Sequence, residues 1–180
     1  MNSLSLQKIA LSFFIVLGSQ MAHSSESTYG IGVASGSGSD GTLKSLNITT
    51  HEGFWSRELG TGWSLIAELE SSLTRIQGKG SNNREVWVVG ISPVLTLQSK
   101  ESPTFLELGV GLSYFDTKQI TDSLSVGTHL EFADLVGFGF KFGRKGQYDL
   151  GFRWIHYSNA GISTNNPGLD FQAIRFRAKF

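Results

Sequence analysis

Three residues in the stretch 154–171, WIHYSNAGISTNNPGLDF, are of types that could act together as a hydrolase. His156 and Ser158 are two positions apart, and in a strand such residues point to the same face with Cα atoms roughly 6.5 Å apart. Asp170 follows after a loop, near the start of the next predicted strand. A serine nucleophile, a histidine base and an acid that orients the histidine are what nucleophilic hydrolysis requires. We therefore predict His156, Ser158 and Asp170 as a catalytic triad.

The loop after Ser158 offers groups that could hold an oxyanion. The backbone N–H groups of Ala160 and Gly161 follow directly after the predicted nucleophile, and donors in that place stabilise the negative oxygen of an acyl-transfer intermediate. Asn159 and Asn166 add side-chain amides. A histidine and a serine at the polar rim of a barrel could also be ordinary surface residues, and spacing alone leaves that alternative open.

Strands that position these residues are indicated by alternation of apolar and small or polar residues. From 105 to 114 the even positions are all large and apolar or aromatic, whereas the odd positions from 107 on are Glu, Gly or Ser. This period of two is typical of a β-strand. Similar runs predict eight strands, near residues 27–35, 43–51, 61–75, 84–98, 103–116, 128–143, 147–158 and 169–180, with turn-prone stretches between them.

Composition limits the class of protein. Of 180 residues, 17% are charged, below the quarter typical of soluble domains, and the formal net charge is zero, which argues against a nucleic-acid partner. Glycine occurs 22 times and cysteine never. We see neither His or Cys clusters with metal-ligand spacing nor a Gly-rich loop that opens a helix. We therefore expect no cofactor and no metal.

The first two dozen residues have the pattern of a signal peptide. Lys8 provides a positive start, residues 9–18 are mostly apolar, and small residues follow at Ala22 and Ser24. The apolar run is too short for a membrane-spanning helix. We expect residues 1–24 to be a signal peptide cleaved near 22–25, and residues 25–180 to form one outer-membrane β-barrel domain.

Two all-β folds compete, a soluble barrel or sandwich and a membrane barrel. The export signal, the long strands and the final strand ending on Phe180 favour the membrane barrel. We therefore predict an all-β, eight-stranded antiparallel up-and-down transmembrane β-barrel. With both termini in the periplasm, the loop 159–168 lies at the outer leaflet, which carries lipopolysaccharide.

The parity of the last two strands places the predicted triad on the lipid face. The other face of these strands carries basic residues, which we expect to point inward and pair with interior acids. The basic residues are Arg153, Arg175, Arg177 and Lys179, and the candidate acids are Glu68, Glu70 and Glu107. Polar groups on a lipid-facing surface are energetically costly, so a polar triad in this place suggests that these residues have a function.

The run HYSNAG at 156–161, with NPG at 166–168 and an acid at Asp170, resembles the signature of the lipid A 3-O-deacylases, the PagL family. The resemblance extends more loosely over the mature chain. It implies Ser158 as nucleophile, His156 as general base and Asp170 as the orienting acid. Asn159 and Asn166 would support the oxyanion site. The family acid is commonly glutamate, so Asp170 is one methylene shorter and strand pairing must bring it closer to His156.

The function that the resemblance implies is an outer-membrane esterase that removes the 3-O-linked hydroxy fatty acid from lipid A of lipopolysaccharide. Its active site would face the outer leaflet of a Gram-negative outer membrane, with Phe152 and Trp154 in contact with acyl chains. A homodimer is left open. The alternatives are a non-enzymatic barrel with an adhesive or structural role, a phospholipase or acyltransferase on the same scaffold, and a soluble lipocalin-like carrier.

Overall fold

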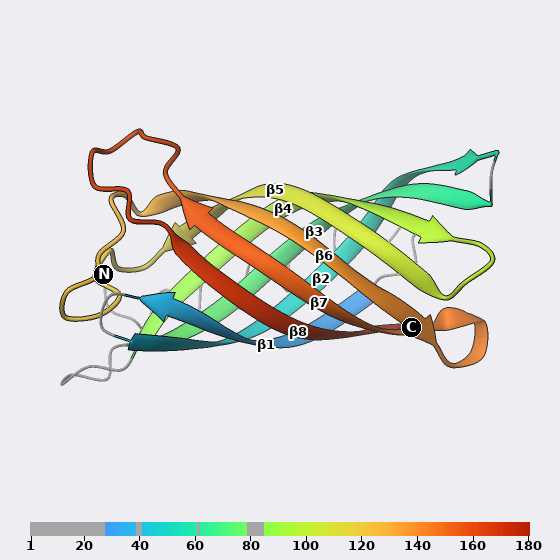
Figure 1. The fold of residues 1–180 in the computed structure, drawn as a ribbon, viewed down its shortest axis with the longest axis horizontal. Helices are drawn as coiled ribbons and strands as arrows, with labels where there is room; N and C mark the ends of the chain where they lie inside the picture. The colour runs from blue at the N-terminus through green and yellow to red at the C-terminus, as the bar shows by residue number, and fades with distance from the viewer. Residues whose placement is uncertain (1–27, 39–40, 61, 79–84) are drawn as a thin grey trace.

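The computed structural model describes residues 28–38, 41–60, 62–78 and 85–180. The strands are β1 Thr28–Gly38, β2 Gly41–Leu59, β3 Trp63–Gly78, β4 Glu85–Ser99, β5 Thr104–Phe115, β6 Leu130–Phe142, β7 Tyr148–Ser158 and β8 Leu169–Lys179, with a short 3-10 turn, η1, at Arg144–Gly146. Each strand is antiparallel to its neighbours, and β8 pairs with β1 to close the barrel (Figure 1). The predicted eight-stranded antiparallel up-and-down barrel is confirmed.

The barrel has two unlike ends. One end carries the connections 116–129 and 159–168, and we call it the loop end; the other carries the short turns between β4 and β5 and between β6 and β7, and we call it the turn end (Figure 1). Helices long and apolar enough to cross a membrane are absent from the described ranges. The predicted signal peptide, residues 1–24, lies outside them.

Strand β2 is longer than the alternation predicted. The pattern indicated a strand at 43–51, whereas β2 continues for 19 residues to Leu59. Its pairing with β3 shifts register between Gly53 and Trp55. The extra residue of such a bulge breaks the period of two, so the sequence pattern ends where the bulge begins. Beyond it, β2 and β3 project past the other strands at the turn end (Figure 1).

The outer face is apolar, the inverse of a soluble barrel. The outward side chains of β5 illustrate this, since Leu106, Leu108 and Val110 are each more than half exposed. Inward positions of the same strand include Glu107, which is buried. Lipid-facing apolar residues that alternate with polar lumen residues are the pattern of a membrane barrel.

Ion pairs fill the middle of the lumen. Arg153 donates to Glu70 and Glu107 at 2.6 Å each, and Arg175 donates to Glu107 at 3.1 Å. Arg177 donates to Asp149 at 2.7 Å and to Glu68 at 3.0 Å. The predicted inward pairing of the three arginines is confirmed, and Asp149 is an acid that the sequence pattern did not single out. Lys179 is exposed at the turn end.

The loop end of the lumen is filled by apolar side chains. The connection 116–129 folds over it and inserts Ile120, Leu124 and Val126, all buried. These pack with inward residues of the strands, including Phe115 and Tyr157, whose rings meet edge to face at 5.4 Å. The lumen-facing side of β7 and β8 therefore packs against this apolar core, close to the predicted triad on their outer side.

Candidate active site

His156 and Asp170 face each other across β7 and β8. Their Cα atoms are direct partners in the register, and Nδ1 of His156 lies 2.9 Å from Oδ1 of Asp170. The side chains are 29% and 49% exposed, so the pair lies on the outer face and not in the lumen. Direct pairing is what allows the shorter aspartate to reach the imidazole.

Ser158 is the last residue of β7 and shares the outer face with His156. Within the described part of the chain, neither its hydroxyl nor Nε2 of His156 forms a side-chain hydrogen bond. Because Asp170 occupies Nδ1, Nε2 is the ring nitrogen that is left free to accept a proton. Bonds between nucleophile and base are often long before a substrate binds.

Two neighbours restrict the His156 ring. Trp154 stacks on it, with ring centroids 5.7 Å apart and planes 15° apart. Gly168 lies against its edge, where an added Cβ would be 2.9 Å from Cε1. Gly168 also has φ +70°, a conformation that L side chains rarely adopt. Glycine therefore serves both the turn into β8 and the close approach to the imidazole.

The loop 159–168 is built around the buried Asn159 side chain. Its Oδ1 accepts from the backbone N–H groups of Gly161 at 3.1 Å and Ser163 at 3.3 Å, and its Nδ2 donates to the carbonyl of Asn165 at 3.0 Å. Its own backbone N–H donates to Oδ1 of Asn166 at 3.0 Å. In this structure the amides of Asn159 and Gly161 thus hold the loop together.

Two donors of the predicted oxyanion set remain unengaged among the described residues. They are the backbone N–H of Ala160, which follows Ser158 by two positions and has φ +51°, and the Nδ2 group of the exposed Asn166. Ala160 is close to Ser158 in the sequence, and Asn166 is bonded to the backbone of Asn159, the residue after Ser158. Both donors are therefore candidates for binding the oxyanion.

The connection 116–129 anchors this loop from behind. Nδ2 of Asn165 donates to both the carbonyl and the hydroxyl oxygen of Ser125, at 3.1 Å each. Gly127 lies so close that an added Cβ would be 1.9 Å from the Asn165 carbonyl oxygen. The connection 116–129, which covers the loop end of the lumen, therefore packs directly against the loop of the candidate site.

Asp134 is a neighbour of the site that the sequence analysis did not select. It is the direct partner of His156 on β6, so the histidine lies between two carboxylates on the outer face. The available signal was its place in the row of outward residues of β6, where the other members are apolar. A charged residue in such a row is costly unless it has a use.

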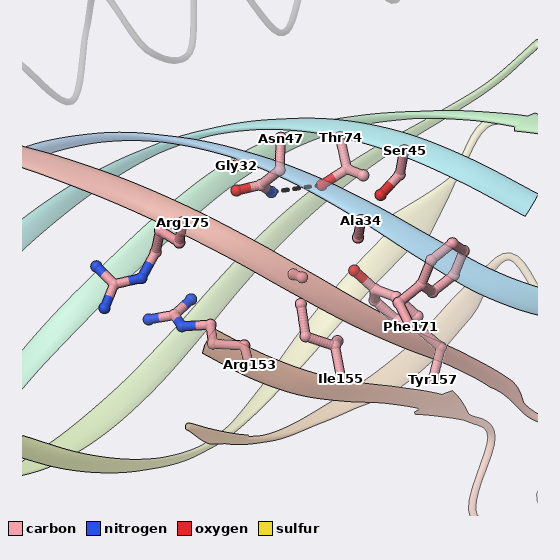
Figure 2. A pocket seen from close by; sticks show the side chains of 11 residues that line it. Gly32, Ala34, Ser45, Asn47, Thr74, Arg153, Ile155, Tyr157, Phe171 and Arg175 are labelled. Carbon is pink, nitrogen blue, oxygen red and sulfur yellow. Dashed lines mark hydrogen bonds between the residues drawn. The ribbon is translucent and has the colours of Figure 1, made fainter. Parts of the chain in front are cut away.

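The lumen behind the site has little room. The cavity in Figure 2 has a volume of about 20 Å³, roughly enough for one water molecule. Ile155 and Tyr157, which alternate with His156 along β7, line it together with Arg153 and Arg175, and Asn47 donates to Thr74 across it at 2.6 Å. An acyl chain would not fit there.

A larger cavity of about 220 Å³ opens at the turn end. Charged side chains, among them Glu68, Lys141, Asp149 and Arg177, line it. It lies at the opposite end of β7 from Ser158 and is unsuited to an apolar chain. A lipid substrate would therefore have to meet the candidate triad from the outer face of the barrel.

Residues 41–179 match the model of one protein family, described as Lipid A 3-O-deacylase (PagL). The chain is similar to the lipid A deacylase PagL of Bordetella bronchiseptica, at 30% identity over 129 residues that make up 70% of each chain. It is also similar to the lipid A deacylase PagL of Pseudomonas aeruginosa, at 37% identity over 73 residues, 41% of this chain and 40% of that protein.

Solved structures show the same fold. A crystal structure of the outer membrane enzyme PagL aligns with a TM-score of 0.71 and 21% identity, covering 84% of this chain and 99% of that one. Neisserial surface protein A aligns with a TM-score of 0.55 and 16% identity, covering 87% of this chain and 97% of the other. At these identities the likeness concerns the barrel architecture.

Proposed function

The chain belongs to the lipid A 3-O-deacylase (PagL) family of outer-membrane hydrolases, and we propose that it performs this reaction with Ser158, His156 and Asp170. The observation that carries the proposal is the 2.9 Å bond between His156 and Asp170 on the outer face at the end of β7. In that place the triad would meet a lipid that diffuses within the outer leaflet.

The reaction would begin with attack of the Ser158 hydroxyl oxygen on the carbonyl carbon of the 3-O-linked ester. Nε2 of His156 takes the serine proton, while Nδ1–H donates to Asp170, which stabilises the imidazolium. The N–H of Ala160 and the side-chain amide of Asn166 hold the oxyanion. Asn159 and Gly161 support them by fixing the loop.

Collapse of the tetrahedral intermediate breaks the bond to the sugar oxygen, which receives the proton from His156. Water, deprotonated by the same histidine, then attacks the acyl-serine ester. The bond between the acyl carbon and the Ser158 oxygen breaks, His156 returns the proton to that oxygen, and the hydroxy fatty acid is released. Phe152 and Trp154, exposed on the same face of β7, would contact acyl chains. All these groups come from one chain, so the chemistry does not require a homodimer.

The test is mass spectrometry of lipid A from cells that express this chain or its Ser158→Ala variant. The parent should remove one hydroxyacyl group, and the variant should remove none while still reaching the outer membrane as a folded barrel. Thr164→Ala, which deletes an exposed hydroxyl in the same loop, is the matched control and should behave as the parent.

Full activity of Ser158→Ala would overturn the nucleophile. Fatty acid released from glycerophospholipid with lipid A unchanged would replace the deacylase with a phospholipase, and acyl groups gained by lipid A would indicate an acyltransferase. The narrow, ion-paired lumen argues against a lipocalin-like carrier, because such a carrier needs an interior cavity for its ligand.

A further inference from the structure

The outer face on the two sides of the candidate triad differs in chemistry. Strand register defines rows of directly opposed residues, and three rows pass through Trp154, His156 and Ser158 of β7. Residues in a row lie about 5 Å apart from strand to strand and share a face. Following these rows in the two directions shows what a bound lipid would touch.

Toward β8, β1 and β2 the rows are polar. Trp154 is opposite Gln172, which is opposite Ser35, which is opposite Lys44. In the next row Asp170 is opposite Ser37, which is opposite Thr42. We call Gln172, Ser35, Ser37, Thr42 and Lys44 the polar flank. All five side chains are exposed.

Toward β6 and β5 the same rows are apolar, Asp134 excepted. Ser158 is opposite Phe132, which is opposite Leu112, and Trp154 is opposite Val136, which is opposite Leu108. We call Leu108, Leu112, Phe132 and Val136 the apolar flank. Leu108 is 60% exposed, so this surface is available to lipid.

Strand tilt gives the two flanks different depths. Barrel strands are inclined to the axis, so a row of opposed residues climbs as it passes round the barrel. In the row of His156, Val110 lies in the middle of β5, whereas Ser37 and Thr42 lie next to the loop-end termini of β1 and β2. The apolar flank therefore lies deeper in the bilayer and the polar flank nearer the outer water.

This gradient matches an acylated, phosphorylated amino sugar, whose acyl chains lie in the bilayer and whose phosphate lies at its surface. Lys44 is the cation on the polar flank, and it has no ion pair among the described residues, whereas Arg75 on β3 pairs with Glu85. β2 lies three strand spacings from β7, about 14 Å. That is the scale of a sugar headgroup plus a lysine side chain.

We propose that the polar flank is the headgroup subsite of the enzyme, with Lys44 bound to a phosphate of lipid A and the scissile acyl chain directed along the apolar flank. The proposal rests on the proposed deacylase function and adds the orientation of the substrate. β7, β8, β1 and β2 adjoin one another in that order round the barrel, which makes the subsite continuous with the triad (Figure 1).

The test uses the full mature chain in detergent micelles, with bisphosphorylated lipid A or the same lipid A after removal of its phosphates. Lys44→Gln should lower kcat/KM on the phosphorylated lipid about fivefold, mainly through KM, because one exposed charge pair is lost. On the dephosphorylated lipid the variant should differ from the parent by less than about twofold. Lys145→Gln, an exposed lysine of η1 at the turn end, is the matched control and should leave both rates unchanged.

An equal loss on both lipids, or none on the phosphorylated lipid, would overturn the subsite. Ser158→Ala is measured in the same assay, so the two proposals fail separately. Activity that survives Ser158→Ala contradicts the proposed function. Activity that depends on Ser158 but ignores Lys44 and phosphate contradicts only the headgroup subsite.

Discussion

At the scale of residues, the position of the acid decides how the histidine can act. Asp170 is one methylene shorter than the glutamate common in the family pattern, yet it reaches Nδ1 of His156 because the two Cα atoms are direct cross-strand partners. The bond fixes the tautomer in which Nε2 is the free base. An acid at the next outward position of β8, that of Gln172, would lie opposite Trp154 instead of His156.

Asp170→Asn should therefore lower kcat by about 100-fold or more, because an amide can hold the histidine in the wrong tautomer and does not stabilise the imidazolium. Asp170→Glu should stay within about tenfold of the parent, since the carboxylate is kept. Single-turnover release of fatty acid from lipid A measures both. If the asparagine variant were as active as the glutamate variant, Asp170 would have no part in the proton transfer.

At the scale of elements, the hairpin of β7 and β8 positions the imidazole through its loop as well as its strands. Gly168 precedes β8 with a positive φ and lies against the edge of the His156 ring, and Trp154 stacks on its face. The position of the ring is thus restricted by a strand neighbour at its face and by a turn residue at its edge. A substitution at Gly168 or Trp154 can disturb either contact without replacing any of the three proposed catalytic side chains.

Gly168→Ala should lower kcat about 10- to 100-fold, because its Cβ would lie 2.9 Å from Cε1 of His156 and must displace the imidazole from its present position. Gly146→Ala in the turn between β6 and β7 is the control. Gly146 has φ +67°, but a Cβ there would meet Lys141 at an ordinary 3.5 Å. Both variants carry a similar backbone strain of about 1–2 kcal/mol, so only the contact with His156 differs between them. Equal kcat values for the two variants would contradict a positioning role for Gly168.

The elements also show how far sequence patterns reach. The period of two survives intact along β7 and β8, so the shared face of His156, Ser158 and Asp170 could be predicted from the alternation alone. It fails at the Gly53 bulge of β2, where one extra residue reverses the parity. The course of the connection 116–129 and the hydrogen bonds of Asn159 could not be predicted from any periodic pattern. They depend on contacts between residues far apart in the sequence, such as Asn165 with Ser125.

At the scale of the whole molecule, stability and chemistry occupy different parts of the barrel. The lumen holds a network in which Glu107 accepts from both Arg153 and Arg175, while the candidate site lies on the outer face at the loop end. Among the described residues, ion pairs occupy the middle of the lumen and apolar side chains its loop end, so a lipid would have to reach the candidate site from the outer face. Burial in the lumen also makes each ion pair costly to break, since a partner left alone would be a buried, uncompensated charge.

Glu107→Gln should therefore lower the free energy of unfolding by about 3 kcal/mol, because Arg153 and Arg175 lose the charge between them. Urea titration of the barrel in lipid vesicles, followed by tryptophan fluorescence, measures this. Glu101→Gln, an exposed residue of the turn between β4 and β5, is the control and should change the free energy of unfolding by less than about 0.5 kcal/mol.

At urea concentrations below its unfolding transition, the Glu107→Gln variant should deacylate lipid A at the parental rate, because the network does not contact the outer face. A variant as stable as the parent would show that the lumen arginines are compensated without Glu107. A stable but inactive variant would instead connect the lumen to the site and contradict this separation of stability from chemistry.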